Sequence, residues 1–134
     1  MRSFLQEIAT GWHRGVGAVH AVGLTEGLKS DKAGLSYLLD VLEPTLQALE
    51  ARLQVHIDRG EMRAADTRHA ALWLLSPVLL ALLHQHELGG TRCRPLDVEA
   101  LLQEHALVFA SVYRPQTNGR QGDTSHPSSD HLKR

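Results

Sequence analysis

The chain has 134 residues, of which 43% are hydrophobic and 22% are charged, an ordinary composition for one globular domain. The formal net charge of −1 argues against a protein that binds nucleic acid by itself, because such a protein carries a basic stripe. The single cysteine, Cys93, excludes an internal disulfide and is consistent with a reducing cytoplasm. No basic stretch followed by an apolar run opens the chain, so we expect no secretion signal.

The first 30 residues are predicted to be helical. Residues 1–22 place apolar side chains on one side of a helix, although three glycines in this range each cost up to about 1 kcal/mol relative to alanine. Residues 23–30 are predicted to form a short second helix or a turn. These helices therefore depend on tertiary packing.

A long third helix is predicted from a cap at Ser30 or Asp31 to Arg59. Its leucines recur at alternating steps of four and three, which is a strong helical pattern. Pro44 removes one backbone N–H, so we expect a kink near Glu43.

The fourth predicted helix begins at a cap residue, Asp66, and is apolar on every side from residue 70 to residue 83. The run is too short to span a bilayer, which needs about 20 apolar residues, so no membrane partner is expected. The core of a small domain covers only part of such a helix. The remainder is predicted to pack against another chain, and Pro77 is expected to bend the helix.

The last predicted helix follows a glycine pair, a loop over residues 91–95 and a cap at Asp97, and it ends at Tyr113. The fold class expected is all-α: an antiparallel helical bundle whose last two long helices form a four-helix bundle with a second copy, giving a homodimer. The predicted interface residues are Leu79, Leu82, Leu83, His86, Leu101, Leu102, His105, Phe109 and Val112. Two of these are histidines, which would make the interface sensitive to pH. The alternative is that both helices lie inside a monomer.

Two regions are predicted: a helical domain over residues 1–114 and a disordered tail over residues 115–134. The tail consists mainly of Gly, Ser, Thr, Asn, Gln and charged residues, which bury too little apolar surface to offset the entropy of ordering.

The order of these features resembles the C-terminal half of the TetR family of transcriptional regulators. The resemblance rests on residues 57–63 (IDRGEMR), the cap at Asp66, the alanine-rich apolar helix, the glycine pair, the sequence PLD at residues 95–97 and the final amphipathic helix. It covers roughly residues 20–114. It implies a cytoplasmic ligand-sensing and dimerisation domain, expected in a repressor, that responds to a small and largely apolar effector.

The basic helix-turn-helix segment that this family carries at its start is absent from these residues. The resemblance therefore implies contact with DNA only through an N-terminal domain that is not present in this chain. Two interpretations stay open: a shortened form of a regulator, or a protein that has lost its DNA-binding half. The identity of the effector, the operator and the sign of regulation are not indicated by the sequence.

In the resembled family the ligand pocket lies among the helices that precede the dimer pair. The candidate ligand-binding residues here are Trp12, Val16, His20, Tyr37, Leu38, His69 and Trp73. Together they offer indole, phenol and imidazole groups suited to an apolar or aromatic ligand with a few orienting hydrogen bonds. Each of these residue types is more often part of an ordinary core than of a pocket.

Metal binding and catalysis are not predicted. The nine histidines include His84 and His86, but residues two apart on a helix point to different faces and do not readily share an ion. No nucleophile-elbow, phosphate-loop or Cys-x-x-Cys motif occurs, so we expect no enzyme and no cofactor. The alternatives to a sensor are an interaction module that heterodimerises with a full-length relative and, ranked last, a helical enzyme or metal carrier.

Overall fold

The fold is given by a computed structural model that describes residues 2–115, with side-chain surroundings from Phe4 onward. Within this range every regular element is a helix, as predicted, and no strand occurs. The elements are α1 (Arg2–Gly11), η1 (Trp12–Val16), α2 (Gly17–Gly27), α3 (Asp31–Tyr37), η2 (Leu38–Leu42), α4 (Glu43–Asp58), α5 (Thr67–Leu82), η3 (Leu83–Glu87), α6 (Gly90–Cys93) and α7 (Val98–Val112). The predicted tail lies outside the described residues except for Pro115.

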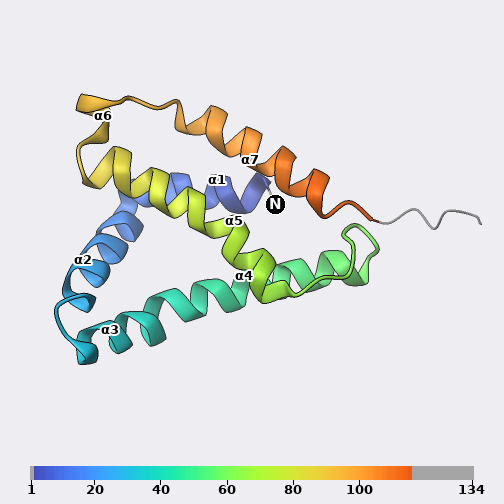
Figure 1. Cartoon of the computed structure of the whole chain (residues 1–134), viewed down its shortest axis with the longest axis horizontal. Coiled ribbons are helices and arrows are strands. Elements are labelled where there is room, and N and C mark those ends of the chain that lie inside the picture. Colours follow the sequence, from blue (N-terminus) through green and yellow to red (C-terminus); the bar gives the residue numbers. More distant parts are fainter. Residues whose placement is uncertain (1, 116–134) are drawn as a thin grey trace, which may run out of the picture.

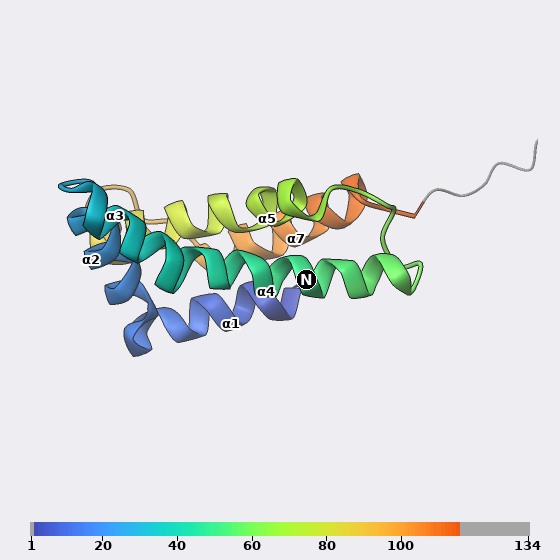
Figure 2. The same ribbon diagram turned by 90° about the horizontal axis from the view of Figure 1, so that it is seen from below.

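The three η elements are wide turns in which a backbone N–H bonds the carbonyl five residues earlier. Helix α5 packs against α1, α4 and α7, and is the central element of the fold (Figure 1). Helices α2 and α3 form a helical hairpin at one end. Seen from below, α3 and α4 follow each other along one side, with α1 on one flank of α4 and α5 on the other (Figure 2).

The prediction of one helix over residues 1–22 is wrong. The chain bends at Gly15, whose φ of 117° is strained for any residue with a side chain. Beyond this bend, α2 continues to Gly27, past the boundary expected at residue 22. The bend turns α2 away from α1 and allows it to pair with α3.

The long third helix is divided by η2, next to the kink predicted near Glu43. Ser30 is its cap, because its hydroxyl accepts the backbone N–H of Ala33 at 3.2 Å. Pro44 has no N–H for the carbonyl of Asp40, and the wide turn just before it accommodates that loss. The extra residue in the turn rotates the apolar stripe by about 100°. As a result, Leu35 is exposed whereas Leu46 is buried.

Asp66 caps α5 as predicted: its carboxylate accepts the backbone N–H groups of Arg68 at 2.9 Å and His69 at 3.1 Å. One side of α5 is buried against the other helices, through Ala70, Ala71, Leu74, Leu75, Val78 and Leu82. The opposite side of α5 is exposed. The expectation that this chain covers only part of the apolar helix is therefore confirmed.

Polar side chains, one buried and one partly exposed, hold the two ends of α7. The Gln85 amide, 2% exposed, donates to the carbonyl of Arg94 and accepts the N–H of Leu96, both at 2.9 Å. At the other end, Arg63 donates from Nε to the carbonyl of Val112 at 3.1 Å, and its guanidinium lies over the Tyr113 ring. The loop predicted at residues 91–95 contains the last residues of the one-turn helix α6.

Candidate functional site

Three of the candidate ligand-binding residues form a buried row of rings behind the α2–α3 hairpin. Trp12 comes from η1, His20 from α2 and Tyr37 from the end of α3. The indole and imidazole rings stack, with centroids 5.8 Å apart and planes 8° apart. The His20 imidazole meets the Tyr37 ring edge-on, and its Nδ1 lies 2.6 Å from the phenol oxygen. The bend at Gly15 makes this row possible because it brings α2 back over η1.

Gly23 provides the space for the Tyr37 ring. A side-chain carbon on Gly23 would lie only 2.1 Å from Cδ2 of that ring, so no other residue fits without displacing the tyrosine. The phenol can then reach His20 from the side of α3. The ring row thus depends on a glycine one turn away from the histidine on the same helix.

Burial keeps the histidine–tyrosine pair neutral. Loss of solvent lowers the pKa of His20 from its usual 6.5 and raises the pKa of Tyr37, because the charged form of each is less well solvated inside the protein. A neutral pair shares one hydrogen bond, in which the phenol donates to Nδ1 or Nδ1–H donates to the phenol oxygen.

The Trp12 indole carries a hydrogen-bond donor that no other described residue uses. The Trp12 side chain is 2% exposed, and its Nε1–H has no partner among the described residues. A side-chain carbon on Gly17 would lie 2.4 Å from this nitrogen and 2.6 Å from a carboxylate oxygen of Glu87. Because glycine occupies this position, the indole of η1 packs beside the acidic end of η3.

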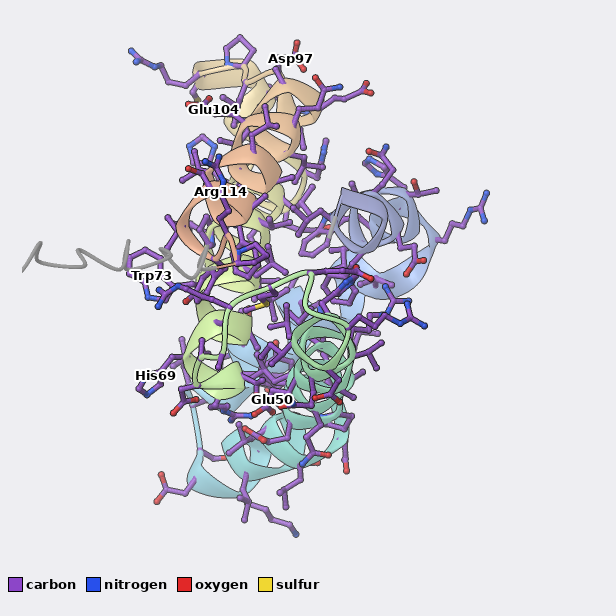
Figure 3. All side chains as sticks on the ribbon, turned by 90° about the vertical axis from the view of Figure 1, so that its right-hand side faces the viewer. Glu50, His69, Trp73, Asp97, Glu104 and Arg114 are labelled. Carbon is purple, nitrogen blue, oxygen red and sulfur yellow. The ribbon has the colours of Figure 1, made fainter. Side chains whose placement is uncertain are left out.

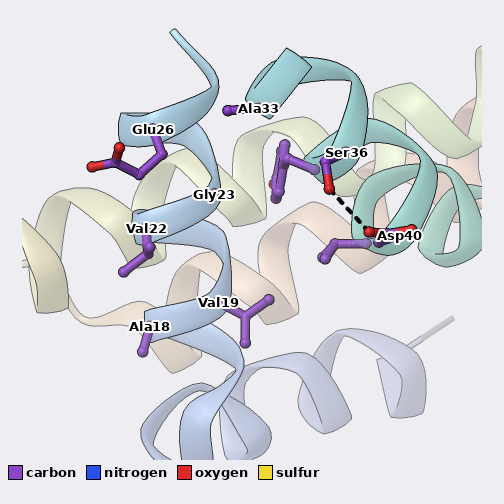
Figure 4. Close-up of a pocket in the computed structure, with 10 residues that line it drawn as sticks. Ala18, Val19, Val22, Gly23, Glu26, Ala33, Ser36 and Asp40 are labelled. Carbon is purple, nitrogen blue, oxygen red and sulfur yellow. Dashed lines mark hydrogen bonds between the residues drawn. The ribbon is translucent and has the colours of Figure 1, made fainter. Parts of the chain in front are cut away.

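A groove of about 530 Å³ runs along the outer side of the hairpin, between α2 and the α3–η2 segment (Figure 4). Tyr37 is one of its walls, so the ring row and the groove share a residue. The other lining residues are Ala18, Val19, Val22, Gly23, Glu26, Ala33, Ser36, Asp40 and Val41. We take the groove with its ring row as the candidate ligand site.

The structure gathers only part of the predicted ligand set. Val16, one turn from Trp12 in the sequence, and Leu38, which follows Tyr37, are exposed and do not line the groove. His69 and Trp73 project from the surface of α5 (Figure 3), are exposed and do not line the groove either. The groove residues that the sequence analysis missed, such as Val22 and Asp40, recur at helical spacing on two separate helices. That spacing could have identified each wall, but not that the walls face each other.

The exposed side of α5 and the neighbouring side of α7 form a second candidate surface, here called the α5–α7 face. It consists of Leu72, Trp73, Leu80, Leu107, Val108 and Val112. The Trp73 side chain is 70% exposed, which is unusual for the largest apolar residue type. Beside it lies an apolar notch of about 290 Å³ that Trp73, His105, Val108, Phe109, Val112 and Tyr113 line.

The residues predicted for the dimer interface divide into three groups. Leu82, Leu102 and Phe109 are buried within this chain, and Phe109 also lines the notch beside Trp73. The most regular apolar stripe of each helix packs against the chain's own core. Leu79, Leu83, Leu101 and His105 are partly buried, and Val112 and His86 are exposed.

The two interface histidines have partners inside the chain. Nε2 of His105 lies 2.9 Å from the carbonyl oxygen of Leu74, so this nitrogen carries the proton and joins α7 to α5. The His86 ring packs edge-on against the ring of His13, with centroids 4.5 Å apart. Across residues 4–115, no three His, Cys, Asp or Glu side chains come together in a way that could hold a metal ion.

Comparison with known proteins yielded no matching family model, curated protein or solved structure. In the part of the chain that the structure covers, none of the helices combines the length and apolar character needed to cross a bilayer. The function proposed below is therefore argued from the two surfaces and from the sequence pattern.

Proposed function

We propose that this chain is the ligand-sensing and dimerisation domain of a TetR-like transcriptional regulator, acting as a helical bundle that pairs through α5 and α7. The observation that carries the proposal is the exposed α5–α7 face with Trp73 projecting from it. Large aromatic residues are typical anchors of protein interfaces, because they bury much apolar area and lose little conformational entropy.

Two-fold symmetry is the simplest arrangement that covers this face. A second copy related by a two-fold axis would place its own α5 and α7 against these two helices, so that the same residues are buried on both sides. Four helices would then surround the axis, as the resemblance to the TetR family implies. The contacts would come from Trp73, Leu80 and Val108, and not from the stripe that the chain's own core already covers.

The α2–α3 groove supports the sensing part of the proposal. Its volume is typical of pockets for small molecules, and apolar residues with a few polar groups line it. The domain would then bind a small effector at one end and a second copy along α5 and α7. The proposal assigns no catalytic step, and no DNA contact, to these residues.

Light scattering of the purified chain tests the proposal. We expect a dimer at micromolar concentration, and a monomer when Leu80→Glu places a charge in the middle of the α5–α7 face. The matched control is Leu28→Glu, which adds the same charge at an 88% exposed leucine beyond the end of α2 and should leave the dimer intact.

A monomeric wild-type chain would overturn the homodimer. The alternative function, an interaction module that heterodimerises with a full-length relative, would then account better for the same exposed face. Mixing the chain with such a relative would show whether the face binds a different partner.

A further inference from the structure

The charged side chains that line the α2–α3 groove are both acidic. Glu26 belongs to α2 and Asp40 to η2, so the two carboxylates come from opposite walls (Figure 4). No lysine, arginine or histidine is among the lining residues, and the rest of the walls are apolar or neutral. The groove therefore offers negative charge beside an apolar surface.

The Asp40 carboxylate is available to a ligand. Its Oδ2 accepts a hydrogen bond from the Ser36 hydroxyl at 3.1 Å, and none of the ion pairs among the described residues involves Asp40. Glu26 has a partner, Lys29, at 3.3 Å, but both side chains are more than half exposed. An exposed pair of this kind contributes little free energy, so a ligand can compete for Glu26.

Tyr37 adds a neutral aromatic wall. Its hydroxyl is held by His20, and burial raises the pKa of the phenol, so the ring stays uncharged. Aromatic rings attract cations through the negative charge on their faces. The groove lining therefore combines two carboxylates and one aromatic ring with apolar valines such as Val19 and Val22.

We propose that this groove binds a lipophilic organic cation, a small molecule that combines an apolar body with one positive charge. The inference rests on the proposed sensing function and names the chemical class of the effector. The apolar part would pack on the valines, and the charge would lie beside Asp40, because the Glu26 carboxylate points away from Asp40 (Figure 4). An anion of the same shape would meet two negative charges and gain no compensating contact.

Calorimetric titration of the whole chain with two ions of nearly equal shape and opposite charge tests this inference. Tetraphenylphosphonium should bind at least about tenfold more tightly than tetraphenylborate. Asp40→Asn should weaken binding of the cation about fivefold, as expected for one partly screened charge, and more at low salt than at high salt. Lys29→Gln should tighten it slightly, because Glu26 loses its competing partner.

Charge reversal gives the sharpest contrast. Asp40→Lys should invert the preference between the two ions, whereas Glu99→Lys, an equal change at an exposed residue of α7, should leave it unaltered. Circular dichroism verifies that both variants fold, and Asp40→Asn replaces Asp40→Lys if the latter does not.

The possible failures have different meanings. Tight binding of the anion, or binding of the cation that Asp40→Asn does not weaken, would overturn the assignment of a cationic ligand but leave a groove that binds small molecules. Absence of binding for both ions would overturn the cation inference as well. Dimerisation is measured separately by light scattering, so the proposed function can survive or fail independently.

Discussion

The α2–α3 groove and the α5–α7 face both expose apolar surface, and the two are built differently. In the α2–α3 hairpin the helices approach closely, since a side-chain carbon on Gly34 would lie 2.9 Å from the carbonyl oxygen of Gly27. Small residues leave a hollow there, and buried polar rings lie behind it. On the α5–α7 face, large side chains such as Trp73 and Leu80 project outward instead.

The difference separates two kinds of binding. A hollow lined by small residues with a few charges can enclose a small molecule. Projecting aromatic and aliphatic side chains need a complementary protein surface to be covered. The same chain therefore carries a hollow suited to a ligand at the α2–α3 hairpin and a projecting surface suited to a partner along α5 and α7.

The largest expected effect tests the packing behind the groove. Gly23→Val would place a side chain where the Tyr37 ring lies, so we expect a loss of about 3 kcal/mol in the free energy of unfolding, measured by urea denaturation. The control is Gly11→Ala, whose added carbon would meet a Val16 methyl at an ordinary 3.4 Å. That variant should be neutral or slightly stabilising because alanine favours a helix. Equal effects of the two changes would contradict the role assigned to Gly23.

The second prediction concerns the other surface. Trp73→Ala should weaken self-association by about 2 kcal/mol, or about 30-fold in the dissociation constant, because it removes the anchor of the α5–α7 face. Sedimentation equilibrium measures this constant. Leu28→Ala, at a more exposed apolar residue away from the face, should change it by less than about twofold. If neither change alters the dissociation constant, the dimer must form through another surface.

The capped helix starts and the all-helical fold class could be predicted from the sequence. Side-chain caps act locally, so Ser30, Asp66 and Asp97 each stand where the structure begins a helix. The end of α4 near Gly60 was predictable for a similar local reason. Glycine adopts a positive φ readily, and the φ of Gly60 is 74°. It was also predictable that the chain's own core would bury only one side of α5, since the core of a small domain cannot surround an apolar helix.

Features that depend on distant parts of the chain could not be predicted. Gly11, Gly15 and Gly17 look alike in the sequence, but among these three only Gly15 has a positive φ, and no local pattern distinguishes it. The groove likewise needs α2 and η2 to face each other, and no local pattern indicates that pairing. The same holds for the predicted interface stripe, because the sequence pattern alone does not show that the chain's own core buries members such as Leu102.

The third prediction compares the caps of the two helices that carry the α5–α7 face. Asp66 accepts two backbone N–H groups, whereas Asp97 accepts only that of Ala100, at 3.0 Å. Asp66→Ala should lower the free energy of unfolding by about 1 kcal/mol, and Asp97→Ala by less. Both are measured by thermal denaturation at neutral pH. A reversed order would show that α7 depends more on its cap than the central helix does.

The smallest expected effect is a pH dependence of the free energy of unfolding that arises from His20, behind the groove. Because burial lowers the pKa of His20 below its usual 6.5, the unfolded chain takes up a proton more readily than the folded one as the pH falls. The stability contributed by neutral His20 is therefore complete only well above pH 6.5, where the unfolded imidazole is neutral too, and it decreases as the pH falls through 6.5. Between pH 7.5 and 6.0 the loss is at most about 0.8 kcal/mol for one such group.

His20→Gln retains a polar group beside Tyr37 but cannot titrate, so its unfolding free energy should change less over this interval than that of the wild type. The other histidines are common to both proteins and cancel in the difference. The lowered pKa values of Glu43 and Asp66 act in a more acidic range, below about pH 4.5, because these carboxyls must be protonated before their contribution is lost. Equal slopes for the two proteins between pH 7.5 and 6.0 would mean that water reaches His20 in solution, and the ring row would then be part of the open groove.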